Sequence, residues 1–330
     1  SQLRGHRAVA VPIPRAGLSG AMAPAGEADS ALSRIGPFLL YLAGVFFSAL
    51  VLAYPVWLAV QAAGMDSVPF NKLCFRLLQA CALAGLWPLM HHLRLRAAAD
   101  WGFGRGQSGT SPARGILTGL VAGMALLFLI VAVLLVIEVR VVRPAGDYWH
   151  PAALATLAGK ALLAGFVIAL IEETWFRGAL QRAFELRFGA GSAILTTAIL
   201  YAMVHFVRPD VAVPADEVGW LSGAVVIAGA FGRFSDPAVI DSFAALFAAG
   251  ILLALVRHRC GRIWECIGLH AGFVVVIRLT RKFTELQPDS PYGYLVGGFD
   301  GVIGWLGFAV LAAAAAGYVR LRTGGTSTHA

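Results

Sequence analysis

The sequence predicts an all-α fold, a polytopic membrane helix bundle of about eight transmembrane helices with one re-entrant or interfacial segment. Hydrophobic residues make up 58% of the 330 residues, and only 13% are charged, about half the charged fraction of a soluble domain. The mean hydropathy is +0.75. Apolar runs of about 17–25 residues, the length that crosses a bilayer as a helix, recur from residue 36 onward.

The expected spans follow these apolar runs in chain order. They lie near residues 36–62, 72–92, 115–137, 151–176, 192–206, 237–256, 263–279 and 297–319. The run at 192–206 is short for a full crossing. Residues 218–232 are apolar but shorter still, so we expect them to be re-entrant or interfacial and to cover a site within the membrane.

Four regions are expected along the chain. Residues 1–33 are rich in Ala, Gly, Pro and Arg and contain no long apolar run, which indicates a disordered, basic, cytoplasmic leader. Residues 34–145 hold the N-terminal transmembrane helices, residues 146–320 form a transmembrane core with the candidate site, and residues 321–330 form a short cytoplasmic tail. Arginine is concentrated in alternate connections, and eight spans with both termini in the cytoplasm fit this positive-inside bias. If residues 218–232 also span the membrane, the count becomes nine and the C-terminal half is inverted.

The formal net charge of +8 is scattered in short clusters between the apolar runs. Such clusters are typical of loops beside lipid headgroups, and they argue against nucleic acid as a partner. The four cysteines form no Cys-x-x-Cys pair, so we interpret them as small buried apolar residues. They are Cys74, Cys81, Cys260 and Cys266.

The candidate site begins where a long apolar run ends in Glu172, Glu173 and Arg177. Ionisable side chains inside a membrane segment are costly and therefore indicate function. Glu173 and Arg177 are four residues apart, so on a helix they share a face and can pair. Glu172 is rotated by about 100° and is left for proton chemistry. The simpler interpretation is a salt bridge that closes a helix end.

Two histidines in later apolar runs can reach these carboxylates. The helix that carries Glu172 is expected to continue to Arg187 and to reverse at Gly189–Gly191. Glu172 precedes Gly189 by 17 residues, and His205 follows Gly191 by 14, distances of about 25 and 21 Å along antiparallel helices. His270 also lies within the membrane. Two carboxylates and two histidines at similar depth predict a hydrolytic or metal-binding site.

The order of these motifs resembles the CPBP family, the CAAX proteases and bacteriocin-processing intramembrane proteases related to the type II CAAX prenyl endopeptidase. The resemblance covers about 40% of the chain, residues 150–280, so residues 146–320 become a CPBP-like catalytic core. It rests on three motifs in sequence: Glu172-Glu173-x-x-x-Arg177, Tyr201-x-x-x-His205, and His270. Tyr201 stands where the family usually has Phe, and Val274 stands where it usually has Asn or Asp.

The resemblance implies an intramembrane endopeptidase, a peptide hydrolase of glutamic type that uses no cofactor. Amide hydrolysis needs an activated water, a stabilised oxyanion and a proton for the leaving nitrogen. We assign Glu172 as the general base, since a carboxylate in a low-dielectric bundle can take and return a proton. Glu173 pairs with Arg177 or assists Glu172, His205 orients the water, and His270 donates to the oxyanion.

Alternatives remain open at this point. A zinc-dependent version of the protease would bind Zn²⁺ through His205, His270 and Glu172, although the compact His-Glu-x-x-His signature is missing. A non-catalytic immunity or scaffold protein of the same fold is favoured by Val274. A proton-coupled transporter would predict an inverted repeat, and none is visible in the sequence.

The expected partners are the lipid bilayer and a membrane-embedded or lipid-anchored protein or peptide substrate, without nucleic acid. The expected location is a multi-pass integral position in a bacterial inner membrane. The bacterial assignment rests on the excess of arginine over lysine: only Lys72, Lys160 and Lys282 are lysine.

Overall fold

Long α-helices make up most of the protein in the computed structural model, which describes residues 31–65, 67–104, 109–144, 146, 149–208 and 210–323. The all-α membrane bundle is confirmed. Most of the predicted leader and tail, residues 1–30 and 324–330, lies outside the described residues. The helices are α1 (Ala31–Ala62), α2 (Phe70–His92), α3 (Pro112–Val136), α4 (Pro151–Glu173), α5 (Gln181–Phe188), α6 (Ala190–Val204), α7 (Ser222–Gly229), α8 (Ile240–Cys260), α9 (Trp264–Phe283) and α10 (Trp305–Thr323).

Short elements complete the described chain. A π-helix, η2 (Thr174–Leu180), joins α4 to α5. Single turns of 3₁₀-helix occur at η3 (Ala215–Glu217), η4 (Gly232–Ser235), η5 (Pro237–Val239) and η6 (Gly293–Leu295). Strands β1 (Arg140–Val142) and β2 (Thr284–Leu286) form a small antiparallel sheet, with Val141 opposite Glu285. This sheet, which the apolar pattern did not predict, joins the α3–α4 connection to the one that follows α9.

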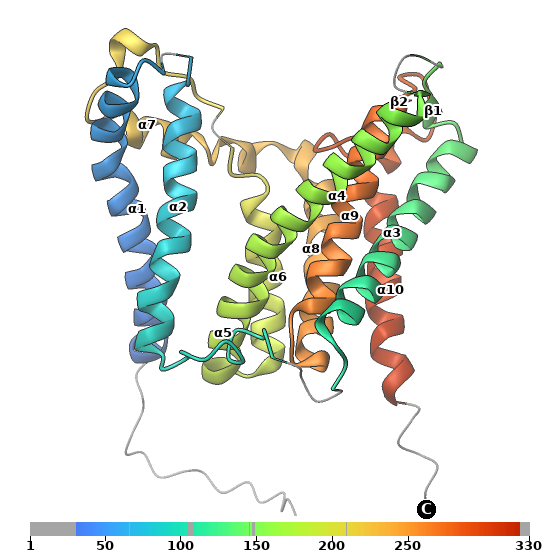
Figure 1. Cartoon of the computed structure of the whole chain (residues 1–330), viewed down its shortest axis with the longest axis horizontal. Helices are drawn as coiled ribbons and strands as arrows, with labels where there is room; N and C mark the ends of the chain where they lie inside the picture. Colours follow the sequence, from blue (N-terminus) through green and yellow to red (C-terminus); the bar gives the residue numbers. More distant parts are fainter. Residues whose placement is uncertain are drawn as a thin grey trace, which may run out of the picture.

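The helices run alternately up and down between the two ends of the molecule. In Figure 1, α1, α3, α6 and α9 rise while α2, α4, α8 and α10 descend, so the described chain begins and ends on the same side. Five helical segments of the described chain are long and apolar enough to cross a membrane: Ile35–Ala62, Phe70–His92, Pro112–Val136, Pro151–Phe188 and Pro237–Cys260. Shorter apolar helices occur at Ala190–Val204 and Trp305–Arg320, and the expected span 263–279 falls on α9. The count of eight crossings stays a prediction.

Helix α9 lies between α3 and α4, and glycines bring the backbones together. A Cβ atom on Gly119 of α3 would lie 2.2 Å from the carbonyl oxygen of Glu265. A Cβ on Gly268 of α9 would lie 2.1 Å from the carbonyl oxygen of Ile116. Only glycine allows these helices to approach so closely. The contact determines the position of His270, which follows Gly268 by two residues.

Helices α1 and α2 form a pair at one side of the molecule (Figure 1). The indole Nε1 of Trp175, in η2, donates to the hydroxyl of Tyr41 in α1 at 2.9 Å. That hydroxyl donates in turn to the carbonyl of Ala82 in α2 at 2.8 Å. A single relay of two hydrogen bonds therefore connects this helix pair to the segment after Glu173.

The apolar stretch 218–232 forms the short helix α7, which packs against α1 and α2. Its buried Val226 and Ile227 belong to a cluster that includes Ala53 and Cys74. The expectation that this stretch covers the site is not met. Among the described residues, Phe299, from the connection before α10, places its ring 5.9 Å from the ring of His205.

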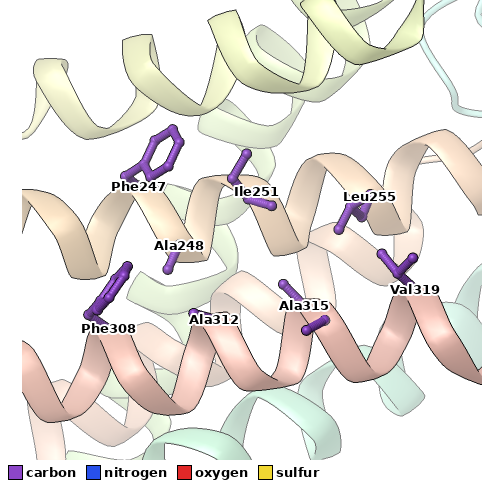
Figure 2. Close-up of a pocket in the computed structure, with 9 residues that line it drawn as sticks. Phe247, Ala248, Ile251, Leu255, Phe308, Ala312, Ala315 and Val319 are labelled. Carbon is purple, nitrogen blue, oxygen red and sulfur yellow. The ribbon is translucent and has the colours of Figure 1, made fainter.

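An apolar pocket of about 340 Å³ lies between α8 and α10. Figure 2 shows Phe247, Ile251 and Leu255 on one helix facing Phe308, Ala315 and Val319 on the other. None of its lining side chains is ionisable, and none is a candidate site residue. The pocket is therefore separate from the chemistry considered below.

Candidate active site

Three helices contribute the candidate site. Glu172 and Glu173 end α4, His205 directly follows α6, and His270 lies within α9. The chain reverses between α5 and α6 at Gly189, whose φ of +82° is readily adopted by glycine. The helices on the two sides of this turn run antiparallel, so the carboxylates and His205 lie at similar depth. In the structure the carboxylate of Glu172 lies 4.0 Å from the ring of His205.

Glu172 faces both histidines. Its Oε2 atom lies 4.0 Å from Nε2 of His205 and 3.9 Å from Nε2 of His270. The side chain is 31% exposed, but Oε2 itself is buried and has no hydrogen-bond partner in the described chain. Burying a carboxylate oxygen without a hydrogen-bond partner costs free energy, so this oxygen favours accepting a hydrogen bond.

Glu173 lies beside Glu172 in sequence but has a different set of contacts. Its Oε1 atom is 2.8 Å from Nδ1 of His270, and its Oε2 atom is 3.4 Å from Nε of Arg177. Both Glu173 and Arg177 are fully buried. Glu173 therefore connects a buried cation to the ring of His270.

Arg177 is enclosed by protein on all sides. Its Nη2 donates to the carbonyl of Gly250 in α8 at 3.3 Å, and its guanidinium lies 4.9 Å from the ring centre of Tyr201. The π-helix η2 places this residue one turn beyond Glu173. The sequence predicts a continuous α-helix here, whereas the structure widens it into a π-helix, a feature found often at functional sites.

Hydrogen bonds at Nδ1, the ring nitrogen that faces away from Glu172, orient the imidazoles of His205 and His270. Nδ1 of His205 lies 2.6 Å from the carbonyl oxygen of Tyr201. A carbonyl only accepts, so this nitrogen carries the hydrogen. Nδ1 of His270 faces the carboxylate of Glu173 and carries a hydrogen for the same reason. Both rings therefore present Nε2 to Glu172.

The three facing atoms, Oε2 of Glu172 and Nε2 of His205 and His270, are of types that bind zinc. Two ligands of a tetrahedral zinc, each about 2.1 Å from the ion, are about 3.4 Å apart. The separations here are wider, and within the described ranges no group of three or more His, Cys, Asp and Glu side chains is arranged to hold a metal ion. The zinc alternative stays a prediction that needs its own test.

Two residues beside the site were not identified from the sequence. The ring of Phe299 lies 5.9 Å from the ring of His205. Asp300 follows it, and its Oδ1 accepts hydrogen bonds from the backbone N–H groups of Val302 and Ile303 at 2.8 and 2.9 Å. An acidic residue within the apolar run 297–319 was the available signal. Val274 lies one turn after His270 and brings no polar group to the site.

Comparison with known proteins gives one match. Residues 154–276 match the family model described as Type II CAAX prenyl endopeptidase Rce1-like. This part of the chain is Rce1-like. The Rce1-like segment includes all five candidate site residues, and the resemblance to CAAX proteases is confirmed over it. No curated protein and no solved structure matched the chain.

The Rce1-like match and the apolar helices together support two statements. The protein is an integral membrane protein, and its residues 154–276 are similar to a family of CAAX-type intramembrane proteases, which are peptide hydrolases.

Proposed function

We propose that this protein is an intramembrane endopeptidase that hydrolyses a peptide bond with a water molecule activated by Glu172. One observation carries the proposal. Oε2 of Glu172 is buried, has no hydrogen-bond partner among the described residues, and lies within 4.0 Å of Nε2 on both His205 and His270. The family match supports the reaction class.

The spacing of these atoms suits a shared water. Two atoms that each hydrogen-bond to one water at about 2.8 Å are about 4–4.5 Å apart. The separation of 4.0 Å from His205 lies at the lower limit of that range, and the separation of 3.9 Å from His270 lies just below it. A water held by Glu172 and His205 has a strong proton acceptor on one side and an orienting group on the other.

The reaction follows from this arrangement. The water oxygen bonds to the peptide carbonyl carbon while its proton passes to Oε2 of Glu172. Protonated His270 donates from Nε2 to the oxyanion, which stabilises the developing charge. Glu172 then returns the proton to the leaving nitrogen, the C–N bond breaks, and the products are a carboxylic acid and an amine.

Glu173 and Arg177 support the histidine rather than the water. The carboxylate of Glu173 holds Nδ1 of His270, as the aspartate of a catalytic triad holds its histidine. Arg177 balances the charge of Glu173, since an isolated buried carboxylate is very costly. The pair therefore keeps His270 oriented and able to carry positive charge during the reaction.

The substrate that we propose is a membrane-embedded or lipid-anchored protein or peptide. Leu170 and Ile171, next to Glu172, are 47% and 44% exposed. Large exposed apolar side chains of a membrane helix face lipid or an apolar partner. A substrate segment held in the bilayer can thus approach Glu172 along α4. The membrane that we propose is a bacterial inner membrane.

Replacing the base tests the function. Glu172→Gln keeps the size of the side chain and removes the basic oxygen, while Glu217→Gln alters an exposed carboxylate elsewhere. Cells producing the wild type, Glu172→Gln or Glu217→Gln would be compared by quantifying new peptide termini in their membranes. We expect termini that appear with the wild type and Glu217→Gln to disappear with Glu172→Gln, at equal membrane levels of the three proteins.

Two other results have defined meanings. Identical termini with wild type and Glu172→Gln would reject Glu172 as the base. Absence of any terminus dependent on the wild type would favour the non-catalytic membrane factor, for which Val274 is the sequence argument.

A further inference from the structure

The apolar pocket between α8 and α10 is a feature that the proposed reaction leaves unused. It extends from Phe247 and Phe308 at one end to Leu255 and Val319 at the other (Figure 2). Phe308 and Val319 are 36% and 38% exposed, so the pocket opens on the outer surface of the helix bundle. In an integral membrane protein, such an exposed apolar surface faces lipid or an apolar partner.

The dimensions of the pocket suit a hydrocarbon chain. Leu255 follows Phe247 by eight residues, a distance of about 12 Å along α8. One leaflet occupies about 15 Å, half of the hydrocarbon core of a bilayer. The pocket holds about 340 Å³, whereas a helix about 10 Å wide occupies roughly 900 Å³ over the same length. The pocket therefore has room for an acyl chain of one leaflet but not for another helix.

A cation lies at one end of this pocket. Arg259 follows Leu255 by four residues on α8, and its Nη1 donates to the carbonyl of Tyr318 on α10. Its Nη2 donates to the carbonyl of Val319 at 3.2 Å. The guanidinium also lies 5.0 Å from the centre of the Tyr318 ring. Arg259 thus extends from one helix to the other where the apolar lining ends.

The contacts of Arg259 leave its positive charge uncompensated. Within the described part of the chain, they are with two neutral carbonyl groups and one aromatic ring. The two hydrogen bonds use two of the five N–H groups of a guanidinium. Arg320, which is exposed and follows Val319, adds a second positive charge to the same end. That end therefore suits a negatively charged group.

The charged end of the pocket lies on the side of the molecule where the described chain begins (Figure 1). The arginine bias assigns this side to the cytoplasm. The cytoplasmic leaflet is the one that carries anionic headgroups at high density, and basic pockets between membrane helices on that side bind them. The length of the pocket and the charge at its end thus point to the same kind of ligand.

We propose that this pocket binds one anionic phospholipid, with an acyl chain between α8 and α10 and the phosphate at Arg259 and Arg320. Guanidinium N–H groups bind phosphate oxygens through charge-assisted hydrogen bonds. None of the lining residues belongs to the candidate active site. The lipid site therefore goes beyond the proposed function and does not depend on it.

Lipid binding can be measured on the purified full chain by native mass spectrometry. The two lipids to compare are phosphatidylglycerol and phosphatidylcholine with identical oleoyl chains, so that they differ only in the headgroup. We expect the first phosphatidylglycerol to bind at least about tenfold more tightly than the first phosphatidylcholine, because each arginine near an anionic headgroup contributes about fivefold.

Two variants with matched controls test the two parts of the site. Arg259→Gln should lower the preference for phosphatidylglycerol by about fivefold, while Arg94→Gln, at an exposed position after α2 on the same side, should retain it. Ala316→Trp fills the pocket and should weaken the binding of both lipids. Ala313→Trp adds the same side chain at an exposed position of α10 outside the pocket and should not.

Equal dissociation constants of the wild type for the two lipids would overturn the proposal, and so would an unchanged preference in Arg259→Gln. If Arg259→Gln does not fold, unchanged lipid binding by Ala316→Trp would overturn it. A dimer that Ala316→Trp abolishes without a change in lipid binding would overturn it in favour of a second copy of the chain. The measurements need no turnover, so the role of Glu172 is left to its own test.

Discussion

Nδ1 of His270 lies 2.8 Å from Oε1 of Glu173, although the two residues are 97 positions apart in the chain. The neighbouring Glu172 approaches Nε2 on the opposite side of the same ring. Adjacent carboxylates on α4 therefore contact the two nitrogens of one imidazole. This difference in contacts is the physical basis for assigning them different roles.

The buried pair Glu173–Arg177 should be essential for folding. Arg177→Ala leaves Glu173 charged and unpaired in a fully buried position, which costs about 3–5 kcal/mol. We expect a large loss of folded protein, measured as the monodisperse fraction in size-exclusion chromatography after extraction. Glu173→Gln in the same chain removes the stranded charge and should restore part of the yield.

A surface pair provides the control for this experiment. Arg182 lies 3.9 Å from Glu185, with its side chain 39% exposed, and such pairs contribute about 0–1 kcal/mol. Arg182→Ala should therefore leave the yield nearly unchanged. Absence of rescue by Glu173→Gln would show that Glu173 and Arg177 do not stabilise each other.

Metal removal distinguishes the two versions of the protease. If Glu172 activates water alone, treatment with a strong chelator should leave cleavage at its initial rate. Elemental analysis of the purified protein should then find zinc well below one ion per chain. Loss of cleavage on chelation and recovery with Zn²⁺ would establish the alternative site, and bound zinc should then fall in His205→Ala and His270→Ala.

The close approach of α3 and α9 should tolerate no side chain at Gly268. A methyl group there would lie 2.1 Å from the carbonyl oxygen of Ile116, so Gly268→Ala must separate the helices. We expect a lower melting temperature and weaker cleavage, since His270 moves with α9. Gly44→Ala in α1, where nothing lies within 4 Å of the new atom, should be neutral or stabilising by about 0.5–1 kcal/mol. Equal melting temperatures for both variants would contradict this packing.

Water must reach Glu172, because hydrolysis consumes it. In a variant without the four native cysteines, single cysteines from Ala198 to His205 would be treated with a small membrane-impermeant thiol reagent. Ala198 and Ala202 are fully buried, whereas His205 is 18% exposed. We expect labelling at the end of α6 and none at the two alanines. An active protein without labelling at any of these positions would rule out an open water path along α6.

The sequence by itself determined the membrane helices and the depth of the candidate site. Composition requires burial of the apolar runs in a bilayer, where backbone groups must be satisfied within helices. The rise per residue then places Glu172 and His205 at similar distances from the turn at Gly189. These predictions depend only on hydrophobicity and on local helix geometry.

Tertiary structure decided how the helices are rotated and which segments meet. The bond between His270 and Glu173 depends on how α9 packs between α3 and α4, and the contacts of Gly119 and Gly268 determine that packing. The placement of α7 against α1 and α2, and of Phe299 against His205, likewise requires contacts between distant segments. Periodicity along one helix carries no information about such contacts, because they depend on the shapes of two surfaces at once.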